Sequence, residues 1–285
     1  TADGQLNLSN LDQLLDGAKL RVENGATLEF VENVAVKSPA FMLDLIDKAD
    51  MPNVGAGAML SGGETLITGA GYRVLFVGNR GPVGTADDPG ESLGSGAILF
   101  GKASLLIRDG AELILRANVA TSAGGLAVAS QGTRLVVSGQ NSRLFARDNV
   151  ATKQMGGAIV ATDGGAIRVG GGASVEFLNN TARVGGALGL DLDSSFVAAA
   201  GKGGFFLAAN NSATGPLGGG AVALAAGASF RIMIPSKFEN NRAFSGPGGA
   251  INQMFDPINS LSGAGECVNV TLETRTFQVP VRDNL

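Results

Sequence analysis

Few side chains in this sequence of 285 residues could carry chemistry, since it has no histidine and one cysteine, Cys267. The lack of histidine excludes a histidine general base, a serine–histidine triad and histidine metal ligands. A single cysteine excludes a disulfide within the chain. The remaining candidates are carboxylates. Asp191 and Asp193 are two residues apart, so both would project from one side of a strand. Asp163 and Arg168 could supply a calcium ligand and a base for a lyase, but they are isolated.

The composition indicates a folded, glycine-rich chain. Hydrophobic residues make up 45% and charged residues 16% of the sequence, which is too apolar for a disordered chain. The 44 glycines do not occupy every third position, as collagen requires. The net charge of -4 gives no reason to expect nucleic acid or an anionic membrane as partner. No apolar run reaches the roughly 18 residues of a membrane span. The chain begins at Thr1 without a secretion signal, so we expect a mature segment of a longer protein.

An asparagine motif recurs along the chain, as in Phe177-Leu178-Asn179-Asn180. Subtracting the numbers of successive aligned asparagines gives intervals of 46, 39, 31, 31, 31 and 30. The basic period is therefore about 31 residues, which is typical of a solenoid. The aligned asparagines are Asn33, Asn79, Asn118, Asn149, Asn180, Asn211 and Asn241.

A glycine motif keeps step with the asparagine motif and follows it by a few residues. Each good copy has two glycines, an alanine and an aliphatic residue. Ser95-Gly96-Ala97-Ile98 and Gly124-Gly125-Leu126-Ala127 are degenerate copies in earlier repeats. The good copies are Gly156-Gly157-Ala158-Ile159, Gly185-Gly186-Ala187-Leu188, Gly219-Gly220-Ala221-Val222 and Gly248-Gly249-Ala250-Ile251.

These repeats predict an all-β, right-handed parallel β-helix, a pectin-lyase-like solenoid of about eight coils when partial coils are counted. In one repeat, Ser174–Phe177, Ala187–Leu192 and Phe196–Ala199 are candidate strands, separated by turn residues. Three such strands with their turns fit a coil of about 31 residues, and each coil would pair with its neighbours at about 4.8 Å. The handedness follows from the crossover rule for parallel strands.

The coil gives each motif residue an expected position. The asparagines would stack at one corner as a structural ladder and bond along the axis. The alternative is that their row forms a ligand-binding ladder on the surface. The glycine motif would supply positive φ and small size at another corner. The phenylalanines expected to stack inside the coil are Phe30, Phe76, Phe145, Phe177, Phe206 and Phe238.

Two insertions and the two ends interrupt the repeat. Residues 38–50 are expected to form a short inserted helix, because serine and proline begin them. An acidic loop contains Asp87, Asp88 and Glu91, which are candidates for binding; the alternative is a solvated loop. We expect residues 1–251 to form the β-helix with an N-terminal cap region. Residues 252–285 would be the last coil, a C-terminal cap or a link to a further domain.

The paired motifs Phe-x-x-Asn and Gly-Gly-Ala-aliphatic resemble the repeats of the polymorphic outer-membrane proteins of chlamydiae. Phe-x-x-Asn occurs at Phe30, Phe76, Phe177 and Phe238, and the resemblance covers most of residues 26–251. It implies a surface-exposed autotransporter passenger that folds as a β-helix and acts in adhesion. The chain departs from the full family pattern because it contains no C-terminal membrane barrel and too few cysteines for a disulfide-linked surface layer.

We therefore expect a non-enzymatic extracellular or cell-surface protein, outer-membrane-associated in a bacterium, with a structural or adhesive display role. It needs no cofactor or metal. Its candidate partners are a surface protein or glycan of a host or neighbouring cell, or further copies of itself, and this segment would not insert into a membrane. The alternatives are a polysaccharide lyase or hydrolase and a subunit of an extracellular filament. A polysaccharide hydrolase of this fold needs clustered carboxylates on adjacent coils. Asparagines that begin glycosylation sequons are Asn7, Asn179, Asn210 and Asn269.

Overall fold

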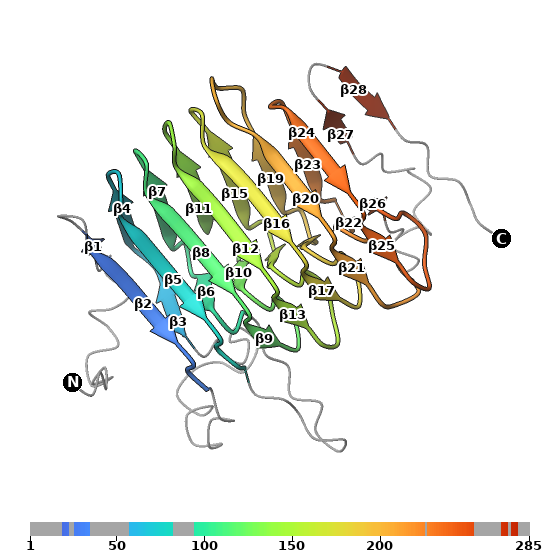
Figure 1. Ribbon diagram of the computed structural model, residues 1–285, viewed down its shortest axis with the longest axis horizontal. Coiled ribbons are helices and arrows are strands. Elements are labelled where there is room, and N and C mark those ends of the chain that lie inside the picture. Colours follow the sequence, from blue (N-terminus) through green and yellow to red (C-terminus); the bar gives the residue numbers. More distant parts are fainter. Residues whose placement is uncertain are drawn as a thin grey trace.

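The computed structural model of the chain is a parallel β-helix, in which β-strands stack along one axis (Figure 1). It describes residues 19–22, 26–34, 57–81, 94–225, 227–253, 269–272 and 275–278. Every regular element within these residues is a strand. The helix expected at 38–50 lies outside the described residues.

Four sheets run along the axis, and successive coils pair in parallel within each. Sheet A has nine strands: β1 (Lys19–Val22), β4 (Glu64–Thr68), β7 (Ser104–Arg108), β11 (Arg134–Ser138), β15 (Ala166–Gly170), β19 (Ser195–Ala198), β23 (Ser229–Ile232), β27 (Asn269–Leu272) and β28 (Arg275–Gln278). Sheet B has seven: β2 (Thr27–Val31), β5 (Arg73–Val77), β8 (Glu112–Arg116), β12 (Arg143–Arg147), β16 (Ser174–Leu178), β20 (Phe206–Ala209) and β24 (Ser236–Glu239).

The other two sheets complete the coil. Sheet C has five strands of two residues each: β9 (Val119–Ala120), β13 (Val150–Ala151), β17 (Thr181–Ala182), β21 (Ser212–Ala213) and β25 (Arg242–Ala243). Sheet D has seven strands: β3 (Ala58–Ser61), β6 (Ala97–Phe100), β10 (Leu126–Ala129), β14 (Ile159–Thr162), β18 (Leu188–Leu190), β22 (Val222–Leu224) and β26 (Ile251–Gln253).

The chain visits sheets D, A, B and C in that order, which makes five complete coils between β6 and β25 within the described residues. Partial coils precede them (β1–β2 and β3–β5) and follow them (β26–β27). β28 then turns back antiparallel on β27 at one end of sheet A. The predicted parallel β-helix with a repeat of about 31 residues is confirmed. The prediction of three strands per coil misses the short strand of sheet C.

The interior of the coils is apolar because successive residues of each strand alternate between inside and outside. Residues that pair in register in successive strands of a sheet lie above one another along the axis, and we call such a set a column. One column of sheet B points into the interior of the coils. The first three coils place large side chains in this column, and phenylalanine and alanine alternate only from Ala146 onwards. From first to last coil the column contains Phe30, Phe76, Leu115, Ala146, Phe177, Ala208 and Phe238.

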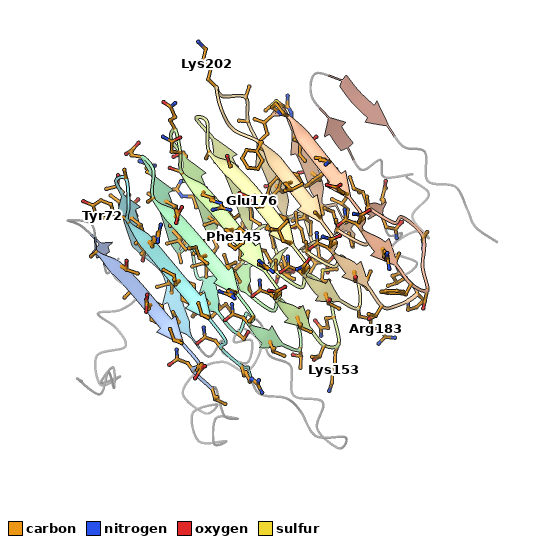
Figure 2. All side chains as sticks on the ribbon, in the orientation of Figure 1. Tyr72, Phe145, Lys153, Glu176, Arg183 and Lys202 are labelled. Carbon is orange, nitrogen blue, oxygen red and sulfur yellow. The ribbon has the colours of Figure 1, made fainter. Side chains whose placement is uncertain are left out.

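Phe145 is the exception among the six phenylalanines expected inside. It stands four residues before Asn149, whereas Phe76 and Phe177 stand three before their asparagines, so strand alternation turns it outward. Ala146 occupies the inward position and is fully buried. Figure 2 shows Phe145 beside Glu176 on the outer face of sheet B. The guanidinium of Arg143 covers its ring at 4.5 Å from the centroid.

Phe206 is inside but stands five residues before Asn211, in a neighbouring inward column of sheet B. It packs edge-on against Phe177 at 5.8 Å and against Phe196 of sheet A at 5.7 Å between ring centroids. Phe230 is also 6.0 Å from Phe206. The expected stacking is present between Phe30 and Phe76, whose ring centroids are 4.8 Å apart and whose planes differ by 10°. In the later coils this cluster, to which sheets A and B both contribute, takes the place of a stacked row.

The glycine motif forms the corner between sheets C and D, and its two glycines have different roles. The first adopts positive φ, 68° at Gly156 and 59° at Gly185, which favours glycine. The second glycine is needed because no side chain fits there. A Cβ on Gly157 would collide with the carbonyl oxygens of Gly186 and Thr181 in the next coil.

Strand register corrects the alignment of the two degenerate glycine copies by one residue. Leu126 pairs with Ile159 and with Ala97. The motif positions in these coils are therefore Ala123-Gly124-Gly125-Leu126 and Gly94-Ser95-Gly96-Ala97.

Candidate functional site

The seven aligned asparagines form one row along the axis, between sheets B and C. Each of the first six side chains is bonded to the next coil, with Nδ2 donating to the following Oδ1 at 2.8–3.0 Å. The same Oδ1 accepts the backbone N–H of the preceding asparagine at 2.9–3.1 Å. The second Nδ2 proton of Asn79 and its successors goes to a backbone carbonyl of the preceding coil at 2.8–3.0 Å.

This arrangement uses every hydrogen-bonding group of the interior ladder amides. The five asparagines from Asn79 to Asn211 are 0% exposed. A fully buried and fully bonded amide has no atom left for a ligand, so the row is structural and the alternative of a surface binding ladder does not apply to these five.

The residue before each ladder asparagine makes the turn and points outward. It adopts the left-handed conformation, with φ of 55°, 56° and 52° at Asn179, Asn210 and Asn240. Asparagine tolerates this region better than most residues, which explains the Asn-Asn pairs. The sequons at Asn179 and Asn210 therefore begin at exposed asparagines, with the buried ladder asparagine as their middle residue. Asn269 lies in β27, and Asn7 lies outside the described residues.

The outer face of sheet C bears three outward columns around the ladder. They are the positions one before, one after and three after each ladder asparagine, and they change residue type from coil to coil. At the last coils these columns line a cleft of about 250 Å³. The residues that line it are Asn210, Ser212, Asn240, Arg242 and Phe244.

The backbone N–H groups of four of the five cleft residues are hydrogen-bonded to neighbouring coils. Asn210 N–H donates to the Glu239 carbonyl at 2.9 Å, and Arg242 N–H donates to the Asn211 carbonyl at 2.9 Å. The Phe244 side chain is 64% exposed. Within the described residues, Arg242 has no carboxylate partner, and the nearby carboxylate of Glu239 is engaged by Lys237 at 2.7 Å.

The outer face of sheet B differs, because it carries ion pairs between coils. Arg73 pairs with Glu112 at 2.9 Å and Arg143 with Glu176 at 2.7 Å, in each case between adjacent coils. Partly exposed pairs of this kind contribute little stability, about 0–1 kcal/mol each. The charges of these two pairs are already engaged, whereas Arg242 has no carboxylate partner within the described residues.

The carboxylates considered for catalysis do not form the arrangement expected from sequence. β18 ends at Leu190, and Asp191 to Ser194 form a turn in which Leu192 and Asp193 have φ of 45° and 59°. The strand alternation that would aim Asp191 and Asp193 the same way is therefore absent. Asp163 is also in a turn, with φ of 52°, and is exposed, as is Arg168 on β15.

The described part of the chain contains no cluster of three or more potential metal-ligating His, Cys, Asp or Glu residues. It also contains no helix long and apolar enough to cross a membrane. The acidic loop candidates Asp87, Asp88 and Glu91 lie outside the described residues.

The cleft could not be found from the sequence motifs, because the motifs mark the inward residues. The usable signal is the outward alternation after each ladder asparagine, as in Asn240, Arg242 and Phe244. Comparison of the chain with family models, with curated proteins and with solved structures finds no match.

Proposed function

We propose that this chain is a non-enzymatic extracellular or cell-surface β-helix with a structural and adhesive display role, and a segment of a larger secreted protein. The observation that supports this is the contrast between a constant asparagine ladder and variable outward columns. Asn33 to Asn241 repeat one bonded unit in every coil, whereas the outward position after the ladder reads Val119, Val150, Thr181, Ser212 and Arg242. A stiff frame that carries changing side chains suits contact with another surface.

The partner we propose is a protein or glycan on the surface of a host or neighbouring cell. The polar side chains that line the cleft at the last coils support contact with a polar surface. The resemblance to the polymorphic outer-membrane protein repeats favours the same role and an outer-membrane-associated location in a bacterium.

The experiment that tests the display role separates binding from cleavage. The chain is incubated with acidic and neutral polysaccharides, and reducing ends and unsaturated products are measured along with retention of the chain on immobilised glycans and on cells. Retention without product formation is the expected result. Time-dependent release of products would instead support the alternative of a polysaccharide lyase or hydrolase.

The two ends of the stack favour a second candidate function, that of a filament subunit. β2 and β24 are the outermost strands of sheet B, and their columns are complementary. Lys237 lies in the column that begins with Glu29, and Phe238 in the column that begins with Phe30.

The ladder and the turn beside it extend this match. Asn241 closes the ladder that Asn33 opens, and Asn240 occupies the turn position of Glu32. An amide and a carboxylate already meet in that column, where Asn179 Nδ2 donates to Asp148 Oδ1 at 3.1 Å. A second copy set on β24 with its β2 would therefore pair at four positions. The β27–β28 hairpin occupies the matching edge of sheet A, so the proposed contact is confined to sheets B and C.

A further inference from the structure

We propose that the cleft on the sheet C face binds a carboxylated sugar unit of a surface glycan. This inference rests on the proposed display function and names the ligand class and the site. The residues are Asn210, Ser212, Asn240, Arg242 and Phe244, which line a cleft of about 250 Å³. That volume lies below the range of about 300–1,000 Å³ for drug-sized ligands, and it suits one sugar ring of a longer chain.

The cleft is built on rigid elements one coil apart. Ser212 and Arg242 are register partners in the paired strands β21 and β25. Asn210 and Asn240 hold the same turn position in successive coils, with φ of 56° and 52°. The Phe244 N–H donates to the Ala213 carbonyl at 2.9 Å. The backbone N–H groups of four of the five residues donate to a neighbouring coil, which fixes the positions from which these side chains leave the backbone.

The polar side chains of the cleft have no hydrogen-bond partner within the described residues. At the same turn position one coil earlier, the side chain of Asn179 is engaged and donates to Asp148 Oδ1 at 3.1 Å. Two amides and a hydroxyl can both donate and accept hydrogen bonds. Sugar hydroxyl groups require partners of this kind.

The charge of the cleft favours an acidic sugar over a neutral one. The Arg242 guanidinium lacks a carboxylate partner in the described part of the chain, and Lys237 engages the carboxylate of Glu239 at 2.7 Å. A guanidinium presents a planar fork of N–H donors that matches both oxygens of a carboxylate.

Phe244 supplies the apolar wall. Its side chain is 64% exposed, although an aromatic side chain gains free energy when it is covered. The C–H face of a pyranose ring could cover it, while the ring hydroxyls turn towards Asn210 and Asn240.

The test is a binding titration of the intact chain with oligomers of galacturonic acid, glucuronic acid and sialic acid, and with neutral oligomers of galactose and glucose. We expect at least one acidic series to bind roughly tenfold or more tightly than its neutral counterpart. The variants Arg242→Ala, Phe244→Ala and Asn240→Ala should each weaken the acidic complex. The affinity of Arg242→Lys should lie between those of wild type and Arg242→Ala, since lysine keeps the positive charge but lacks the planar fork of N–H donors.

Matched controls are exposed residues on other faces, Arg168→Ala on sheet A and Phe205→Ala beside sheet B. They should bind as wild type. Equal affinity for acidic and neutral oligomers, or unchanged binding by the cleft variants, would overturn the proposal. If no oligomer binds but the chain is still retained on cells, the cleft assignment fails while the display function stands. If the chain neither binds oligomers nor is retained on any surface, both fail.

Discussion

At the residue scale, Asn149 makes four hydrogen bonds through its side chain, and all four cross to a neighbouring coil. Its Oδ1 accepts two from Asn118, and its Nδ2 donates to Asn180 Oδ1 and to the Leu115 carbonyl, at 2.9–3.1 Å. None of these groups can reach water from a fully buried position. A residue of this kind is difficult to replace, because each lost bond leaves a buried donor or acceptor without a partner.

We therefore expect Asn149→Ala to lower the free energy of unfolding by roughly 3–5 kcal/mol, since several buried groups lose their partners at once. Asn241→Ala at the last rung should cost about 1 kcal/mol, because that residue is partly exposed and water can replace the bonds. Denaturant unfolding monitored by circular dichroism measures both. An equal loss of unfolding free energy in both variants would show that burial of the interior ladder asparagines does not increase their contribution to stability.

The second glycine of the corner motif leads to a steric prediction. Gly157→Ala should destabilise the chain by several kcal/mol or prevent folding, because the new Cβ would meet the carbonyl oxygens of the next coil. Gly203→Ala is the control, since no atom lies within 4 Å of the place its new methyl group would take and only its φ of 87° is unfavourable. That strain amounts to about 1–2 kcal/mol. Thermal unfolding of both variants distinguishes collision from strain, and a Gly157→Ala chain as stable as wild type would contradict the packing.

At the element scale, strand alternation decides which aromatic residues stabilise a coil. Phe177→Ala should cost about 3–5 kcal/mol, because it empties an interior site. Phe145→Ala should cost about 1 kcal/mol or less, because it removes only an outward contact with Arg143. Comparison of the denaturant midpoints of the two variants tests which of these side chains points into the coil. A larger loss for Phe145→Ala would mean that the strand faces the other way.

Strand alternation also explains which parts of the fold and of the cleft can be predicted from the sequence. The ladder has to appear as a motif, because a bonded row needs an asparagine in every coil, so the period and the parallel β-helix are predictable. The strand Thr181–Ala182 is not, because two residues cannot show alternation. The similarity of Phe145 to Phe177 is misleading, because the distance from the asparagine decides which way the side chain points. The cleft is not predictable, because its residues come from two coils and belong to outward columns that do not repeat.

At the scale of the whole molecule, the complementary ends of sheet B predict self-association. If copies stack through β24 and β2, Lys237→Glu and Glu29→Lys should each weaken association, because each places like charges in one column. The chain that carries both changes should recover it. Both residues are exposed, so folding is not at issue. Sedimentation velocity over a range of concentrations, at low and moderate salt, measures the effect. A wild-type chain that stays monomeric throughout would exclude this contact.

The ladder also gives the molecule an electrical direction. From Asn33 to Asn211, each side-chain amide donates one Nδ2–H to the Oδ1 of the next asparagine, so these ladder bonds all run in one sense along the stack. Chains of aligned hydrogen bonds polarise one another, and burial leaves little solvent to screen the interior members. One end of the row is therefore an acceptor pole and the other a donor pole. Two copies that meet by like ends would oppose acceptor to acceptor or donor to donor, so this polarity favours a single orientation for any neighbour that continues the row.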